Sequence, residues 1–211
     1  MSEPDLKPLI DILRVQKREI LAVICPDDLS QRSVFNGILH LSKDEDVLNY
    51  PPDSVRLVNG IGVLPRSNVK KKLNQYYLSL GYQFETVISE QAWISTEAVI
   101  ETGAQVFAGA IIQTGAKVSA HTIINSKALI EHASVIGKYN HVAPNATICG
   151  QVETSENVYV GASSTLIQNI KLDKNVVVGA GAVVTKNVLE GRTCYPYRTK
   201  TQCNGIGKRQ E

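Results

Sequence analysis

The chain has 211 residues, 22 basic and 20 acidic side chains, a net charge of +2 and 43% hydrophobic residues. This length allows one or two domains with a real core, and so small a net charge gives no field that would favour nucleic acid. No stretch approaches the ~20 apolar residues of a membrane span. The first residues lack the basic and apolar segments of a signal peptide. The four cysteines are scattered and form no CxxC, so we expect reduced thiols and a cytoplasmic protein.

Residues 1–89 alternate between helical and strand patterns. The apolar spacing predicts one helix over 6–13, with Asp5 as N-cap, and a second over 69–80 that ends at Gly81. Strands are expected at 20–25, 55–58 and 84–88. This order is typical of a small parallel sheet with helices on its faces, a partial Rossmann-like α/β domain. A sheet of this kind should open with a strand and a glycine-rich turn, whereas this sequence opens almost directly in a helix.

Ligands of parallel sheets bind at the carboxyl ends of the strands. Asp27 and Asp28 follow the first expected strand, and Gly62 follows the second. These three residues are therefore candidates for binding a ligand. The alternative is that they only shape turns.

From residue 94 to residue 184 an aliphatic residue recurs at every sixth position, and only Thr154 departs from this rule. A second register, two residues earlier, holds small or β-branched residues, with Asn140 as the exception. A fixed period of six is typical of a parallel β-helix, in which each hexad supplies one short strand and one corner. We expect this β-helix over residues 90–188, with residues 189–211 as a tail.

Three hexads per turn give a coil of eighteen residues and about five coils, stacked into a prism roughly 25 Å tall. No loop interrupts the hexads, so a smooth prism has no pocket of its own and its site needs a neighbour. Three-sided columns associate naturally as trimers. The tail carries an excess of basic side chains, which is consistent with a solvated end or with a phosphate contact.

Two histidines in the middle coils, His132 and His141, lie off the aliphatic positions and should point outward or into a corner. Neutral imidazole suits the removal of a proton from an amine or a hydroxyl. Gly150 follows His132 by eighteen residues, one coil, and its N–H could stabilise an oxyanion, unless this glycine only turns a corner. The histidine spacings do not match the close pair of zinc-binding β-helices, so we expect no metal.

Four segments of the expected β-helix carry a resemblance to one family of proteins: Ile130-Glu131-His132, His141 to Ala146, Cys149-Gly150, and Val178 to Val184. With them the chain resembles the sialic acid O-acetyltransferase and nucleotide-4-amino-sugar N-acetyltransferase family of hexapeptide acyltransferases. The resemblance covers the β-helix well and residues 1–89 more loosely.

The resemblance implies a left-handed β-helix and a homotrimer that holds acetyl-CoA, the co-substrate, in the groove between two prisms. It implies that His132 is the catalytic base, and that His141 and Gly150 bind the acyl group. Ala162 and Ala180 match positions that contact the coenzyme. Asp27, Asp28 and Gly62 match positions that hold a sugar or nucleotide-sugar. The expected activity is acetyl transfer to a sugar amine or hydroxyl in polysaccharide or glycan synthesis.

The sequence departs from the family at three places. Ala133 stands where a carboxylate usually follows the catalytic histidine, the first strand is missing, and the tail reads Tyr195-Pro196-Tyr197. Two alternatives therefore stay open. One is a non-catalytic binding or assembly subunit, and the other is an acetyltransferase whose acceptor is not a nucleotide-sugar.

Overall fold

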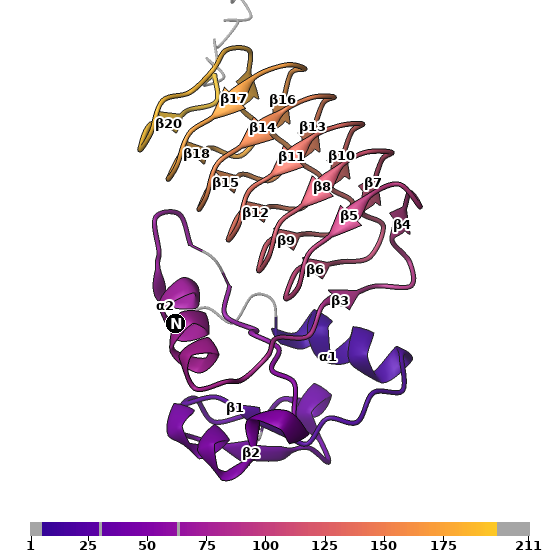
Figure 1. Ribbon diagram of the computed structural model, residues 1–211, viewed down its shortest axis with the longest axis vertical. Coiled ribbons are helices and arrows are strands. Elements are labelled where there is room, and N and C mark those ends of the chain that lie inside the picture. The colour runs from indigo at the N-terminus through magenta and orange to yellow at the C-terminus, as the bar shows by residue number, and fades with distance from the viewer. Residues whose placement is uncertain (1–5, 30, 63, 198–211) are drawn as a thin grey trace, which may run out of the picture.

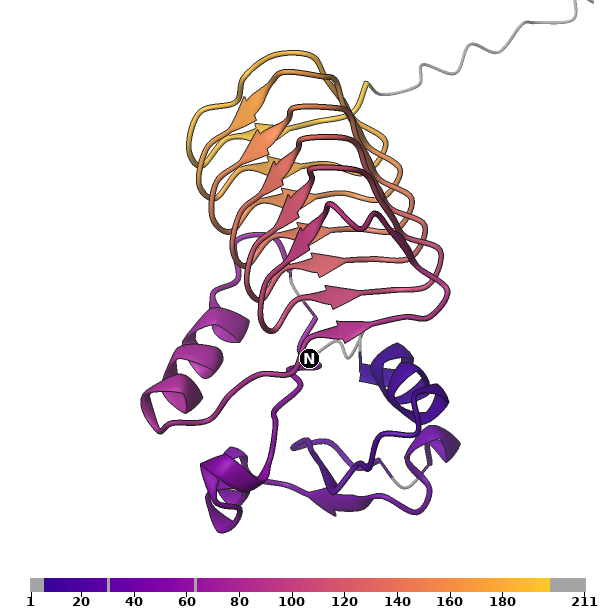
Figure 2. The same ribbon diagram turned by 45° about the vertical axis from the view of Figure 1, so that its right-hand side comes forward.

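The computed structural model describes residues 6–29, 31–62 and 64–197. A three-sided prism of stacked coils stands on a smaller α/β region formed by the N-terminal residues (Figures 1 and 2). No described helix has the length and apolar character needed to cross a bilayer. This arrangement confirms the expected fold class.

The two expected helices are present. Helix α1 spans Leu6–Val15 and α2 spans Val69–Ser79. Helix α1 turns its apolar stripe, with Leu9 and Ile10 buried, toward the rest of the protein. Gly81 follows α2 with a φ of +89°, the left-handed conformation in which glycine ends helices. Asp5, the expected N-cap, lies outside the described residues. Three short 3₁₀ helices lie between α1 and α2: Ser33–Phe35, Asp44–Asn49 and Pro52–Ser54.

The N-terminal sheet is smaller than expected. It consists of two parallel strands, β1 (Ala22–Ile24) and β2 (Leu39–Leu41). The expectation of further sheet strands at 55–58 and 84–88 was wrong, because Leu57 and Phe84 form only an isolated parallel bridge. Strand β3 (Val87–Ile88) instead pairs with the first coil of the prism.

The prism has three parallel sheets, which we name by their outer surfaces. The covered face consists of β3, β6 (Gln105–Val106), β9 (Ile123–Ile124), β12 (His141–Val142), β15 (Tyr159–Val160), β18 (Val177–Val178) and β20 (Thr193–Cys194). The apolar face consists of β4 (Trp93–Ile94), β7 (Ile111–Ile112), β10 (Leu129–Ile130), β13 (Thr147–Ile148), β16 (Thr165–Leu166) and β19 (Val183–Val184). The charged face consists of β5 (Val99–Ile100), β8 (Lys117–Val118), β11 (Val135–Ile136), β14 (Glu153–Thr154) and β17 (Lys171–Leu172).

Each two-residue strand points its second residue into the core and its first residue outward. The inward residues are those of the aliphatic hexad positions, and Ile112, Ile130 and Ile148 are fully buried. The smaller second register, including Ala116 and Ala128, is also buried and fills the same core. The hexad pattern therefore identified the core side chains correctly, since it follows the inward face of every strand.

The corners repeat one backbone conformation. Ten described non-glycine residues of the prism adopt a φ between 54° and 62°: His121, Lys127, Ala133, Tyr139, Asn145, Gln151, Asn157, Ser163, Asn169 and Asn175. This left-handed region is costly for most side chains, so its recurrence at corner after corner is a requirement of the fold. No single corner residue can be assigned a function on that ground alone.

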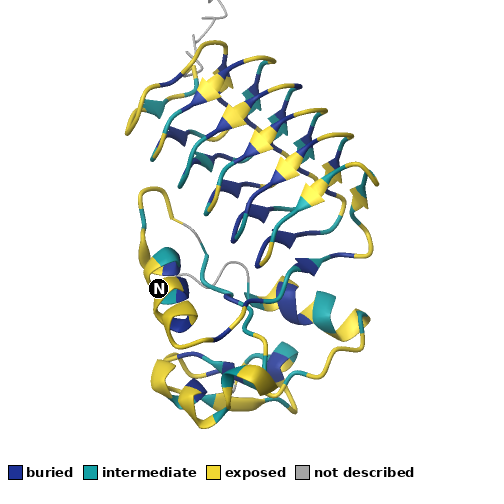
Figure 3. Cartoon of the chain, viewed as in Figure 1, coloured by how far each residue is buried: buried dark blue, intermediate teal, exposed yellow. Residues whose placement is uncertain are grey.

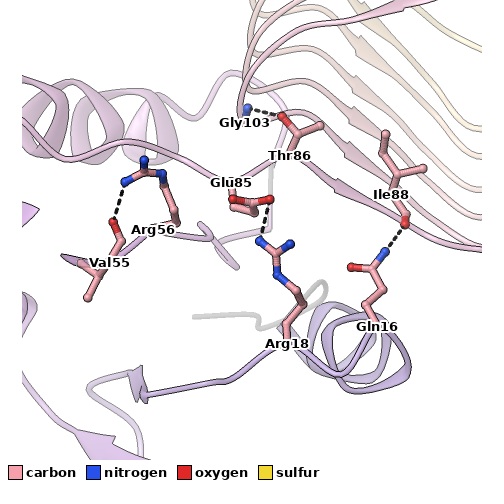
Figure 4. A network of polar contacts seen from close by, with 8 residues as sticks. All are labelled: Gln16, Arg18, Val55, Arg56, Glu85, Thr86, Ile88 and Gly103. Atoms are coloured by element: carbon pink, nitrogen blue, oxygen red, sulfur yellow. Dashed lines mark hydrogen bonds and ion pairs between the residues drawn. The ribbon is translucent and has the colours of Figure 1, made fainter. Parts of the chain in front are cut away.

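The N-terminal region is fixed to the lower end of the covered face. Leu9 of α1 packs with Val87, Phe107 and Ile123 of the prism. Polar contacts surround this packing (Figure 4): the Gln16 side chain donates to the Ile88 carbonyl at 2.7 Å, and Arg18 pairs with Glu85 at 2.8 Å.

One segment, residues 59–62 and 64–68, runs from this region up along the prism, and we call it the strap (Figure 1). At its lower end the Asn59 carbonyl accepts a hydrogen bond from Gln105 at 2.8 Å. At its upper end Arg66 donates to the Gly191 carbonyl at 3.1 Å and to the Thr193 hydroxyl at 2.9 Å. The strap therefore connects β6, near the lower end of the covered face, with β20 at its upper end.

The two exceptions to the hexad pattern meet inside the core. The Asn140 amide donates to the Thr154 hydroxyl at 2.5 Å and its oxygen accepts from the Val158 backbone N–H at 2.8 Å. The Thr154 hydroxyl also accepts from the Gly137 N–H at 3.1 Å. Each exception thus gives the other a buried hydrogen-bond partner.

We expect Asn140→Leu to lower the free energy of unfolding by about 1–3 kcal/mol, because the buried Val158 N–H and Thr154 hydroxyl lose their partner. Urea denaturation measures the change. Thr154→Ser keeps the hydroxyl and is the control, with a smaller loss expected. An Asn140→Leu protein as stable as the wild type would contradict the structural role of this pair.

Candidate functional site

His132 lies at the corner between the apolar and charged faces, which we call the His132 corner. Its side chain is exposed, and its ring lies directly over Gly150, one coil further along. A Cβ at residue 150 would stand 2.5 Å from the His132 Nε2 atom, so only glycine leaves room for the imidazole in this position. The structure therefore brings His132 and Gly150 together, as expected from their spacing.

The backbone around Gly150 is hydrogen-bonded between coils, and the Gly150 carbonyl accepts from the Asn169 N–H at 3.1 Å. The neighbouring N–H groups of Cys149 and Gln151 donate to the carbonyls of Leu166 and His132. Among the described residues, no acceptor takes the Gly150 N–H. An N–H group beside an imidazole is the arrangement that stabilises a developing oxyanion near a base.

His141 lies on the covered face, on the opposite side of the same coil. It is 6% exposed and its ring is stacked on Tyr159 of the next coil, with centroids 5.1 Å apart. Its Nδ1 atom has no hydrogen-bond partner within the described part of the chain. His132 and His141 therefore do not meet in one copy of the protein.

Burial, and to a smaller extent the nearby positive charge of Lys70, lower the pKa of His141 to about 4. His121 behaves in the same way: burial lowers its pKa to about 4, with Lys70 and Lys138 acting in the same direction. Both imidazoles are therefore neutral at pH 7.

Ala162 and Ala180 lie one coil apart at the corner between the covered and apolar faces, the Ala162 corner. The Ala162 carbonyl accepts from the Gly181 N–H at 2.8 Å, and Ala180 is exposed. Below them, a Cβ at Gly161 would meet the Ala180 nitrogen at 2.6 Å. The small residues at the Ala162 corner therefore allow the two coils to lie close together, and their side chains project little from the surface.

The N-terminal candidates are separated from these corners. Asp27 and Asp28 follow β1 and are exposed, and Asp28 lines a pocket of about 270 Å³ together with Phe35, Asn36 and His40. Gly62 is half-buried on the strap. The lining of this pocket includes neither Asp27 nor Gly62.

Sequence reasoning missed three residues near these sites. Tyr159 follows His141 by eighteen residues, so the coil length could have predicted their stacking. His40 carries no such signal, although it lines the Asp28 pocket and contacts the Cys25 carbonyl at 2.8 Å. Lys70 is buried and donates to the Asn59 carbonyl and Gln105, whereas its sequence context suggests a solvated helix face.

The described residues contain no group of three or more His, Cys, Asp or Glu side chains that could hold a metal ion. Cys149 and Cys194 are free thiols, Cys25 is buried, and Cys203 lies outside the described residues.

No family model and no curated protein sequence matches the chain. Solved structures do. Perosamine N-acetyltransferase from Caulobacter crescentus, as a histidine mutant in complex with CoA and GDP-perosamine, is 21% identical with a TM-score of 0.78, over 90% of this chain and 87% of that one. The acetyltransferase domain of PglB from Neisseria gonorrhoeae, in complex with acetyl coenzyme A, is 21% identical with a TM-score of 0.80, over 90% and 93%.

WeeI from Acinetobacter baumannii is similar too, with 26% identity and a TM-score of 0.77 over 89% of this chain and 90% of that one. These matches span the prism and the N-terminal region together. The chain therefore has the fold of these proteins, a left-handed parallel β-helix of hexapeptide repeats preceded by a small α/β region. The two structures whose names state an activity are acetyltransferases.

We expect the protein to lose stability between pH 6.5 and pH 4, because His121 and His141 take up protons in the unfolded chain at an ordinary pKa of about 6.5 but resist protonation when folded. Their contribution to stability is full above pH 6.5 and is lost as the pH falls toward 4. Urea midpoints across this range measure the slope.

The double variant His121→Gln/His141→Gln should show a shallower slope than the wild type between pH 6.5 and pH 4. A double variant with the wild-type slope would contradict this assignment.

Proposed function

We propose that this protein transfers the acetyl group of acetyl-CoA to an amino or hydroxyl group of a sugar, with His132 as general base. The observation that carries the proposal is the exposed His132 ring over the Gly150 backbone, at a corner of a fold shared with sugar acetyltransferases. An imidazole beside an N–H group supplies both a base and an oxyanion donor.

In the proposed reaction the acceptor nitrogen or oxygen attacks the thioester carbon while His132 takes its proton. The Gly150 N–H and His141 bind the carbonyl oxygen as negative charge develops on it. The carbon–sulfur bond then breaks, and the imidazolium returns the proton to the departing thiolate. No covalent intermediate with the protein forms.

We further propose a homotrimer, because this site is incomplete in one copy. His132 and Gly150 lie at one edge of the apolar face, and Ala162 and Ala180 lie at its other edge. A closed three-membered ring in which each copy turns its apolar face to the axis brings the His132 corner of one copy against the Ala162 corner of the next. Acetyl-CoA would then lie in that seam, and His141 would come from the neighbouring copy.

The side chains of the apolar face support this ring. Its outward column includes Trp93, Ile111 and Val183, which are 55%, 38% and 66% exposed. Leu129, Thr147 and Thr165 lie between Ile111 and Val183, so the column carries no charged side chain and its two ends expose apolar ones, as a surface that packs against another copy would. The charged face carries Lys117, Glu153 and Lys171 in the corresponding column, which suits an outer, solvated surface.

We assign residues 1–89 to the acceptor. Asp27, Asp28 and Gly62 are the groups through which this region would hold a nucleotide-linked sugar, and GDP-perosamine is bound by one similar protein. Acetyl-CoA and nucleotide-sugars are cytoplasmic metabolites, and we place the protein in that compartment.

We expect His132→Ala to lower the turnover number by about 100- to 10,000-fold, the usual contribution of a general base. Gly150→Ala should also lower it, because the added methyl group occupies the position of the imidazole. The assay follows release of the CoA thiol with GDP-perosamine and related amino sugars. A folded His132→Ala protein with near-normal turnover would contradict the proposed role.

A mixing experiment tests whether the site is shared between copies. His132→Ala and His141→Ala are each expected to be inactive alone. Co-expressed in equal amounts, they should form trimers in which about a quarter of the seams combine an intact His132 with an intact His141 of the next copy. Activity near a quarter of the wild-type value is expected. No recovery in mixed trimers would show that both histidines act within one copy.

A further inference from the structure

A cluster of buried polar side chains lies under helix α2, and we call it the Lys70 cluster. It consists of Asn59, Lys70, Asn74 and Gln105, which are between 1% and 8% exposed. Lys70 and Asn74 lie one turn apart on α2, and Figure 3 shows that this helix is buried on one side only. The cluster therefore joins α2, the lower end of the strap and β6.

The hydrogen bonds of the cluster hold the Lys70 ammonium in one place. Its Nζ atom lies 3.3 Å from the Asn59 carbonyl oxygen and 3.4 Å from the Gln105 Oε1 atom. The Asn59 carbonyl also accepts from Gln105 at 2.8 Å, and the Asn59 side chain donates to Asn74 at 2.5 Å. The position of the ammonium is thus fixed by groups from three separate segments of the chain.

The strand register places this cluster at the foot of the column that contains His141. Gln105, Ile123 and His141 are successive outward residues of the covered face, and Ile123 is fully buried. Since neighbouring strands are about 4.8 Å apart, the Gln105 backbone lies about 10 Å below that of His141. A charge at this depth acts through the protein interior, where water weakens it less than at the surface.

The imidazole of His141 has one enclosed nitrogen. Its Nδ1 atom is buried and has no hydrogen-bond partner in the described part of the chain, whereas Nε2 is not enclosed in this way. A neutral imidazole carries one N–H group and one lone pair, and a buried N–H without an acceptor costs free energy. A positive charge on the buried side of the ring also attracts the lone pair and repels the N–H. Both effects favour the tautomer whose hydrogen is on Nε2.

We propose that Lys70 is a positioning residue for the proposed reaction: its buried ammonium keeps His141 neutral, with the hydrogen on Nε2, where it donates to the acyl carbonyl oxygen. This inference rests on the proposed function. A positive charge on His141 would oppose the imidazolium that forms on His132, so a neutral His141 favours proton removal by His132. Lys70 itself touches neither the coenzyme nor the acceptor.

The groups around His141 are consistent with this role. Lys70 faces it from α2, Tyr159 is stacked on it from β15, and β9 presents Ile123, which does not titrate. Burial is the larger cause of the low pKa of His141, and Lys70 acts in the same direction. Lys70 is thus the charged group through which a mutation can change the state of this imidazole without touching it.

NMR spectroscopy of the protein with ¹⁵N-labelled histidine reads the tautomer and the titration of His141 directly. The signals of His141 are those that disappear in the variant His141→Gln. In the wild type at pH 7 we expect a neutral ring with its hydrogen on Nε2. A hydrogen on Nδ1, or a doubly protonated ring at pH 7, would overturn the proposal, and this test requires no change to Lys70.

Lys70→Gln keeps a donor for the Asn59 carbonyl and removes the charge. Its His141 should titrate at a higher pH than in the wild type and should populate both tautomers. We expect the turnover number to fall by about 3- to 30-fold, less than the 100- to 1,000-fold of losing an oxyanion donor outright, and the loss should grow as the pH falls. Both KM values should stay within about twofold, because the change acts on charge that develops in the transition state.

Two further variants complete the design. Lys70→Arg keeps the positive charge and should restore both the titration of His141 and the turnover number. Lys71→Gln is the matched control, since Lys71 is the next residue of α2 and pairs with Glu156 at 2.7 Å outside the cluster. It removes the same charge from the same helix, and its His141 titration and turnover number should equal those of the wild type.

The variants can overturn the proposal in two ways. An unchanged titration of His141 in Lys70→Gln would show that the charge does not act on this imidazole. A loss of turnover in both Lys70→Gln and Lys70→Arg, with His141 as in the wild type, would show that Lys70 only supports the fold. If Lys70→Gln does not fold, the tautomer of the wild type and the behaviour of Lys70→Arg still decide.

Failure of the proposed function gives a different result. In that case the wild-type protein neither binds acetyl-CoA in calorimetry nor acetylates GDP-perosamine or related amino sugars, whatever the state of His141. The NMR experiment would then still report how Lys70 acts on His141, and the role of Lys70 in the reaction would be overturned together with the reaction.

Discussion

The structure depends on the register between successive coils of the prism. Backbone hydrogen bonds place each strand residue directly on the residue eighteen positions away, as for Ile130 on Ile148. Because this register does not drift, a side chain at a corner always meets the same corner of the next coil. The contact between His132 and Gly150 is a direct result, and so is the stacking of His141 on Tyr159. Function on such a scaffold is set by which residues share a column.

The same register explains why the prism could be predicted from the sequence. A period of six fixes which residue of each strand points inward, and inward residues of a closed prism must be small or aliphatic. Asn140 and Thr154 are polar residues at inward positions. The core accommodates them because the Asn140 amide donates a hydrogen bond to the Thr154 hydroxyl. Neither exception could be paired with the other from the period alone, because they lie fourteen residues apart.

The N-terminal region could be predicted only in part, for physical reasons that particular residues show. Strand β2 has Leu39 and His40 exposed, so it lacks the apolar run that marks a buried strand. Residues 84–88 have strand character, but the edge of the first coil offers better partners than the small sheet does: the Val87 N–H donates to the Ala104 carbonyl at 3.0 Å. Tertiary contact, not local preference, decided that pairing.

The candidate site, like the N-terminal region, could be predicted from the sequence only in part. The sequence predicted that His132 and His141 point outward or into a corner, but the hexad pattern cannot tell a solvated face from one covered by another part of the chain. His141 is buried because the N-terminal region lies over its face, and a histidine beside a buried lysine has a chemistry very different from one in water.

The strap has a consequence for the length of the prism. From β6 to β20 the covered face rises by five strand spacings of about 4.8 Å, or about 24 Å. The strap is bound near the lower end of this face, where Gln105 of β6 donates to the Asn59 carbonyl, and at the other end, where Arg66 donates to the Gly191 carbonyl and the Thr193 hydroxyl. These two attachments match the number of coils that lie between β6 and β20. A duplication or deletion of one eighteen-residue coil, the simplest change a repeat protein can undergo, would move Gly191 and Thr193 out of register with Arg66 unless the strap changed length with it.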